Sequence, residues 1–146
     1  MSSKVVHFQA QRINTITPTT STYYLSADES GSIVFCNTGI TLYLPPLGSN
    51  NNINKGLNFT IIVLNPESFA SSPITLKSIN DSSVPTNLMI GNGVPHKAAS
   101  LFPINTFEIN ANVAIGDRIN CVCDGKTWYL NWNLTTTTSS DLALTS

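Results

Sequence analysis

Charged residues are scarce in this sequence. They make up 10% of its 146 residues, and the net charge is −1, whereas a typical globular chain has about 25% charged residues. The seven lysines and arginines are scattered along the chain, so they build no cationic patch that follows a phosphate backbone. We therefore expect no nucleic-acid partner. A weakly charged surface lets copies approach one another, which suits an assembly subunit and equally an ordinary β-domain with a neutral surface.

Long apolar runs are missing as well. No segment approaches the roughly 18–20 apolar residues of a membrane-spanning helix, so no membrane partner is expected. The first residues, MSSKVVHFQAQ, have neither the apolar core nor the cleavage pattern of a signal peptide. The sequence thus predicts a protein that is made in a cytoplasm and is not secreted by a signal peptide.

Cysteine is rare. Three cysteines, an odd number, argue against a disulfide framework. Cys121 and Cys123 alternate along a predicted strand and point the same way, while Cys36 belongs to another strand. Structural zinc sites space their ligands more widely than Cys121 and Cys123, so we predict buried free thiols and no metal site.

The residue types that catalysis needs do not converge. The two histidines, His7 and His96, lie far apart in unlike contexts, and the sequence has no G-x-S-x-G, H-E-x-x-H or C-x-x-C motif. Asp117 and Asp124 stand in turns, where an aspartate side chain accepts hydrogen bonds from backbone N–H groups. We predict no catalytic residue and no cofactor. A small β-barrel enzyme is the least favoured hypothesis.

The sequence is rich in short alternating segments, of which Gly116–Asn133 is the clearest. Asp124-Gly125 separates two alternating runs, the pattern of a β-hairpin. A loop of two or four residues sets the apolar faces of the two runs against each other. The inward residues are then Ile119, Cys121 and Cys123 on the first strand, and Trp128, Leu130 and Trp132 on the second.

About nine or ten such strands are predicted, with turn signals every eight to twelve residues. The predicted fold class is all-β: a single-domain antiparallel β-sandwich of jelly-roll type, with a barrel as the alternative. Residues 1–22 are expected to form an extended N-terminal arm, residues 23–133 the sandwich, and residues 134–146 a flexible Thr/Ser-rich tail. Within the sandwich, Ser26–Ser30 is predicted as a capped helical turn and Gly91–Gly93 as a tight turn.

A few outward polar and aromatic residues are candidates for recognition. Tyr129 alternates with Trp128 and Leu130 and therefore points away from the core, as Tyr43 does on its own strand. Sugars stack on exposed aromatic rings flanked by amide side chains. The alternative interpretation is that these tyrosines pack on a second sheet or a neighbouring subunit. The candidate contact residues for a partner or glycan are Tyr43, Asn50, Asn51, Asn52, Tyr129, Asn131 and Asn133.

The order of these features resembles that of a known class of proteins. A strand runs into a proline at Ile40–Pro45, and Gly56-Leu-Asn-Phe59 opens a hydrophobic strand. Gly116-Asp117 and later Asp124-Gly125 with Trp128 complete the layout. The layout spans residues 23–132 and is similar to that of small β-rich virion structural proteins of phages and large DNA viruses, of the capsid-surface or tail-fibre and knob type.

This resemblance implies a non-enzymatic structural role in a virion. It implies a homo-oligomer, most often a trimer, which contacts other virion proteins and is made in the host cytoplasm. The sequence has no heptads or collagen-like repeats, so we expect a capsid, vertex or surface-appendage subunit rather than a fibre shaft. The alternative hypothesis is a lectin-like module that attaches to host glycans.

Overall fold

Alternating apolar and polar residues produce strands throughout the computed structural model. It describes residues 13–37, 39–47, 54–65, 73–97, 103–109, 113–136 and 139–146. The six-stranded sheet consists, in spatial order, of β1 (Thr15–Ile16), β3 (Ile33–Asn37), β5 (Asn58–Asn65), β9 (Arg118–Cys123), β10 (Trp128–Asn133) and β7 (Met89–Val94). The five-stranded sheet consists of β11 (Leu142–Thr145), β8 (Thr106–Ile109), β6 (Ile74–Lys77), β4 (Thr41–Tyr43) and β2 (Thr22–Tyr24). Two short 3₁₀ helices, η2 (Ala27–Glu29) and η5 (Ser139–Asp141), complete the described elements.

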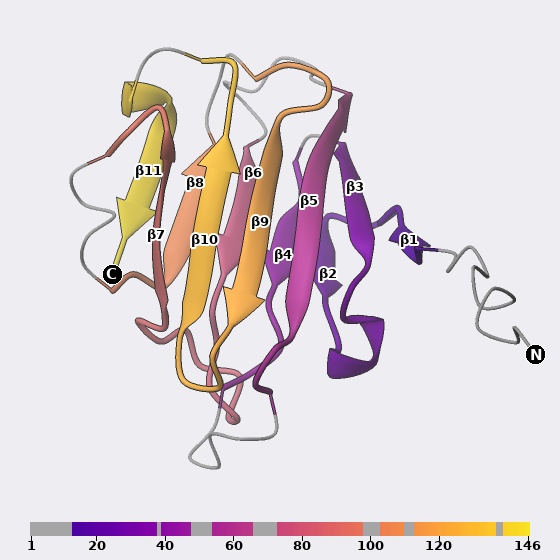
Figure 1. Cartoon of the computed structure of the whole chain (residues 1–146), viewed down its shortest axis with the longest axis vertical. Coiled ribbons are helices and arrows are strands. Elements are labelled where there is room, and N and C mark those ends of the chain that lie inside the picture. The colour runs from indigo at the N-terminus through magenta and orange to yellow at the C-terminus, as the bar shows by residue number, and fades with distance from the viewer. Residues whose placement is uncertain are drawn as a thin grey trace, which may run out of the picture.

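The two sheets face each other and enclose the core (Figure 1). The largest buried side chains come from both layers and include Trp128, Trp132, Phe59 and Phe107. Phe107 of the five-stranded sheet packs against Trp132 of the six-stranded sheet, with ring centroids 5.0 Å apart. The two-layered all-β arrangement is therefore as predicted.

The hairpin prediction is confirmed. Strands β9 and β10 pair antiparallel, and Cys123 lies opposite Trp128, which leaves a four-residue loop. The Asp124 carboxylate accepts hydrogen bonds from the backbone N–H groups of Lys126 and Thr127, both at 2.8 Å. All six predicted inward residues of the two strands are buried. The capped turn is also found, as the helix η2, in which Glu29 accepts a hydrogen bond from the Ser26 N–H.

The prediction of antiparallel sheets is wrong for more than half of the described strand pairs. Five pairs run parallel and four antiparallel. From β1 to β9 the chain changes sheet at every step, so β1 and β3, β3 and β5, β2 and β4, β4 and β6, and β6 and β8 become neighbours, although each pair is two apart in sequence. A parallel pair needs a crossover, and here a strand of the opposite sheet supplies it. Such pairs do not fit the antiparallel Greek keys of a jelly roll.

Both ends of the described chain contribute strands to the sheets. Residues 13–22 were expected in an arm, but β1 pairs with β3 and β2 already begins at Thr22. The predicted flexible tail is likewise wrong, because Leu142 is buried and β11 pairs with β8. Serine and threonine dominate the composition of both segments, which is typical of a flexible segment. A few apolar residues among them nevertheless pack against the core. Residues 1–12 lie outside the described ranges.

The predicted turn at Gly91–Gly93 is part of a strand instead. Strand β7 continues to Val94 and runs parallel to β10. A Cβ atom on Gly91 would lie 2.5 Å from the Leu130 carbonyl oxygen, and one on Gly93 would lie 2.2 Å from that of Trp132. These glycines therefore serve the close approach of two backbones, the other common reason for glycine in a strand.

Candidate functional site on the outer sheet faces

The hairpin presents three of the predicted contact residues on the outer face of the six-stranded sheet. Tyr129, Asn131 and Asn133 alternate with the buried residues of β10 and are all exposed. The hydroxyl of Tyr129 donates a hydrogen bond to the Asp124 carboxylate at 3.1 Å. The backbone N–H groups of the loop lower the pKa of Asp124. The hydrogen bond to Asp124, together with the negative charge of that carboxylate, raises the pKa of Tyr129. The ring of Tyr129 is thus tethered to the hairpin tip.

A row of polar side chains crosses four strands of this face. Asn92, Asn131, Asn120 and Thr60 lie side by side on β7, β10, β9 and β5. The Thr60 hydroxyl donates to the Asn120 side-chain oxygen at 3.1 Å. Asn92, Asn120 and Thr60 are recognition candidates that the sequence interpretation missed. Their outward positions follow from strand alternation, but their common row follows only from the register.

Apolar residues flank this polar row. Val122 lies directly opposite Tyr129 and, like it, is 48% exposed. Among the described outward residues of this face, Arg118 alone carries a formal charge. These residues are Thr15, Ile33, Phe35, Asn58, Thr60, Ile62, Leu64, Ile90, Asn92, Val94, Arg118, Asn120, Val122, Tyr129, Asn131 and Asn133. We call this set the assembly face.

The opposite, five-stranded sheet presents Tyr43 in a different setting. Its ring is half-buried because Tyr24 stacks on it, with ring centroids 4.4 Å apart and an interplanar angle of 7°. Tyr24 on the edge strand β2 is 59% exposed and is the aromatic residue that the sequence interpretation missed. A repeated pattern, Thr22-Tyr-Tyr24 and Thr41-Leu-Tyr43, was the available signal.

Hydroxyl groups accompany these tyrosines on the same outer face. Thr22, Thr41 and Thr75 lie in register on β2, β4 and β6. The Thr75 hydroxyl donates to the Glu108 carboxylate at 3.3 Å. Thr75 itself is buried, so this face offers the hydroxyls of Thr22 and Thr41, the two aromatic rings and the charged side chains of Lys77 and Glu108. The assembly face offers mainly amides and aliphatic side chains.

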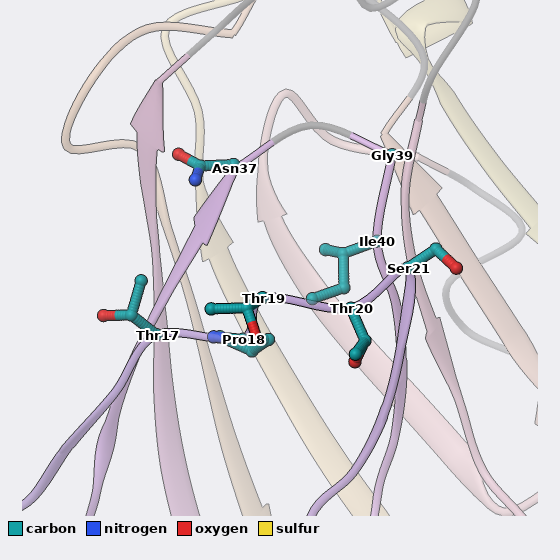
Figure 2. Close-up of a pocket in the computed structure, with 8 residues that line it drawn as sticks. All are labelled: Thr17, Pro18, Thr19, Thr20, Ser21, Asn37, Gly39 and Ile40. Atoms are coloured by element: carbon teal, nitrogen blue, oxygen red, sulfur yellow. The ribbon is translucent and has the colours of Figure 1, made fainter.

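A pocket lies where the chain enters β2 (Figure 2). Its volume is about 310 Å³, at the small end of the range for ligand pockets. Its lining residues carry hydroxyl, amide and aliphatic groups and no titratable side chain: Thr17, Pro18, Thr19, Thr20, Ser21, Asn37, Gly39 and Ile40. The pocket suits a neutral polar ligand and offers no acid or base for catalysis.

The remaining predicted contacts are the loop residues Asn50, Asn51 and Asn52. They lie outside the described residues. The neighbouring Asn54 donates a hydrogen bond from its side-chain amide to the Pro46 carbonyl oxygen at 2.6 Å.

The cysteines are buried free thiols, as predicted. Burial raises the pKa of Cys36 to about 12 and that of Cys121 further still. Burial also raises the pKa of Cys123, whose sulfur accepts a hydrogen bond from the Gly125 N–H. Nucleophilic chemistry and metal binding both need the thiolate, which these sites disfavour at neutral pH.

Other reactive groups are also dispersed in the part of the chain that the structure describes. No three His, Cys, Asp or Glu residues gather there as metal ligands would. The described ranges contain no helix that is long and apolar enough to cross a membrane. Asp117 is buried, and it accepts hydrogen bonds from the Ala114 N–H and from Thr135, which is the turn-capping role predicted for it.

No family model, curated protein or solved structure matches this chain. The chemistry of the two outer faces and of the pocket is therefore the basis for assigning a function.

Proposed function

We propose that this protein is a non-enzymatic structural subunit of a virion, which assembles with copies of itself through the assembly face. The observation that carries the proposal is the near absence of charge among the described outward residues of the six-stranded sheet, where only Arg118 is charged. Interfaces between subunits are depleted in charged residues and enriched in aromatic ones.

The apolar part of the face supports the same role. Outward positions of a solvated sheet are normally polar, yet half of the outward residues here are aliphatic or aromatic. Val122 and Tyr129 form an exposed cross-strand pair, and Val94 is exposed on the adjacent strand β7. Exposed apolar surface of this kind marks interaction sites. Burial against a second copy would remove it from water.

The row of asparagines is compatible with such burial. An amide side chain both donates and accepts hydrogen bonds, so Asn92, Asn120 and Asn131 can pair with polar groups of a neighbouring copy. Among the described outward residues of the face, Arg118 is then the single charge that needs a partner or a position at the solvated rim, because desolvating an unpaired charge is the costly event at an interface. In a cyclic trimer every contact joins the same two surfaces, so the same pairing is repeated at each interface.

The virion assignment rests on the resemblance in motif layout across residues 23–132. That class favours a trimer and contacts with other virion proteins. Strands β1 and β11, near the two ends of the described chain, are paired within the sheets. The contact between copies is therefore proposed for the sheet face rather than for these two segments. A capsid, vertex or surface-appendage position follows for a compact subunit without a shaft.

The test is the oligomeric state and its response to a charge placed on the face. Size-exclusion chromatography with light scattering should give a multiple, expected threefold, of the 15.7 kDa chain mass. Val122→Lys should dissociate the oligomer. The matched control is Val84→Lys, because Val84 is similarly exposed, at 51%, but lies outside the face. A wild-type monomer at every concentration, or equal behaviour of the two variants, would overturn the proposal.

A further inference from the structure

The stacked tyrosines leave one ring face open at the edge of the five-stranded sheet. Their centroid separation of 4.4 Å is close to the 4.7–4.9 Å spacing of neighbouring strands. The two nearly parallel rings therefore stand side by side along the direction of the strand-to-strand hydrogen bonds. Because β2 is an edge strand, Tyr43 covers one face of the Tyr24 ring, and the other face points past the edge.

Backbone groups lie beside that open ring face. The Leu25 N–H donates to the Tyr43 carbonyl, and the Thr41 N–H donates to the Ser21 carbonyl. Alternate residues of a paired strand bond to opposite sides, so Thr22 and Tyr24 direct their amide and carbonyl groups to the open edge. The Thr22 carbonyl accepts a hydrogen bond from the Thr20 hydroxyl at 2.7 Å. The N–H and carbonyl of Tyr24 remain beside the ring.

The hydroxyl-lined pocket lies at the start of the same strand (Figure 2). Thr20 and Ser21 line it and immediately precede β2. Tyr24 lies three residue steps beyond Ser21 along an extended strand, a distance of roughly 10 Å. A ligand with several linked polar rings can therefore use both places, whereas a single ring can use only one.

The size and chemistry of this edge favour a sugar over a peptide strand. Strand β2 has three residues, and such short edges resist the addition of another strand. One exposed phenol ring matches one pyranose ring, whose C–H groups pack on the electron-rich face. Its hydroxyls can bond to the Tyr24 backbone groups and to the pocket. Neither β2, β4 nor the pocket lining carries a charged side chain, and Lys77 lies one strand further from the edge, beside Tyr43. This lining favours an uncharged ligand.

We propose that the open face of Tyr24, with the adjoining pocket, binds a neutral oligosaccharide. Tyr24 is on the sheet opposite the assembly face, and the pocket, which Asn37 of β3 also lines, adjoins the start of β2. An oligomer formed through the assembly face would therefore keep the open face of Tyr24 exposed. It does not depend on the assembly role, and either proposal can fail alone.

The experiment uses an array of neutral hexose and N-acetylhexosamine oligosaccharides, with sialylated and sulfated glycans as charged comparisons. The strongest neutral ligand is then titrated by isothermal calorimetry against the full chain. Tyr24→Ala should weaken binding at least tenfold, and Thr20→Val should weaken it by a smaller factor. Val84→Ala is the control, because Val84 is also exposed, at 51%, but lies outside the assembly face and outside the proposed sugar site, and it should leave the affinity unchanged.

An array with no neutral ligand, a Tyr24→Ala variant with wild-type affinity, or an equal loss of binding in Val84→Ala would each overturn the inference. The circular dichroism spectrum and the thermal unfolding of Tyr24→Ala must match those of the wild type, so that a loss of sugar affinity in this variant reports on the site and not on the fold. If Tyr24→Ala instead changes the oligomeric mass measured by light scattering, the ring contacts another copy of the chain, and the sugar assignment is wrong.

Discussion

Thr135 donates two hydrogen bonds to the buried carboxylate of Asp117, one from its backbone N–H at 2.9 Å and one from its hydroxyl at 2.6 Å. Asp117 precedes β9, and Thr135 follows β10. The pair therefore joins the open end of the hairpin, while Asp124 organises its closed end. Asp117 and Asp124 thus hold together β9 and β10, and β10 carries both core tryptophans.

Asp117→Ala should lower the free energy of unfolding by about 2–4 kcal/mol, because hydrogen bonds to a charged group contribute roughly 1.5–3 kcal/mol each and the donors lose their partner. Urea denaturation monitored by tryptophan fluorescence measures the change. Asp28→Ala, at an exposed position in η2, is the control and should cost less than about 0.5 kcal/mol. Equal stability of the two variants would show that the Asp117 contacts are dispensable.

Trp128→Ala and Trp132→Ala should each cost about 3–5 kcal/mol, the range for removing a large aromatic side chain from a core. Both rings are almost fully buried, and their indole N–H groups donate to the carbonyls of Pro45 and Pro95. Tyr129 lies between the two tryptophans in sequence but points outward, so Tyr129→Ala should lower the free energy of unfolding by less than about 1 kcal/mol. Chemical denaturation of the three variants measures these differences, and a loss below about 1 kcal/mol for either tryptophan contradicts the core assignment.

Gly93→Ala should destabilise the protein by about 1–3 kcal/mol or more, as over-packing does. The added Cβ would meet the backbone and ring of Trp132, so β7 would have to move away from β10. Asn92→Ala is the control, since that neighbouring side chain is exposed and should change stability by less than about 0.5 kcal/mol. Thermal unfolding of both variants provides the comparison. An unchanged midpoint for Gly93→Ala means that the two backbones are further apart than described.

Stability should fall as the pH drops from about 5 toward 3. Burial raises the pKa of Glu29, but hydrogen bonds from the Tyr23 hydroxyl and the Ser26 N–H outweigh it, and the pKa lies below its ordinary value of 4.5. Backbone N–H groups likewise lower the pKa of Asp124 below 3.8. A carboxylate whose pKa is lower in the folded state than in the unfolded state stabilises the fold at pH values above the unfolded-state pKa. That stabilisation is lost as the pH falls through the folded-state pKa.

Glu29→Gln should therefore show a smaller decrease of the melting temperature between pH 6 and pH 3 than wild type. Tyr23→Phe removes one donor to Glu29, at 2.5 Å, and should reduce the pH dependence in the same direction. Scanning calorimetry at half-unit intervals of pH measures the slopes. Identical slopes in all three proteins would rule out the contribution of this contact.

Local predictions from the sequence were accurate where one strand or one turn decided the outcome. Alternation in β9 and β10 identified the inward residues, and the Asp124-Gly125 turn identified their pairing. The same reasoning placed Tyr129, Asn131 and Asn133 outward, because side chains of a strand alternate. It also identified Asp117 as a turn-capping residue.

Predictions that needed a partner strand were less successful. The pattern of β3 and β4 is the same whether they pair with each other or lie in different sheets, and they lie in different sheets. Tyr43 was correctly placed outward, but its neighbour Tyr24 lies on another strand, 19 residues earlier in the chain. The open ring face that carries the sugar proposal is therefore a property of the pair and not of either residue's local sequence.

The sequence by itself determined the class of the fold, the hairpin, the inward residues of its two strands and the burial of the thiols. It also limited the hairpin loop to two or four residues, and the loop has four. These follow from the period-2 alternation of strands and from turn residues, which act within a few positions of the chain. Only the tertiary structure decided the parallel pairing, the incorporation of both described ends and the composition of the two outer faces. Those depend on which distant strands become neighbours, and that choice is made by burial of the whole core rather than by any one segment.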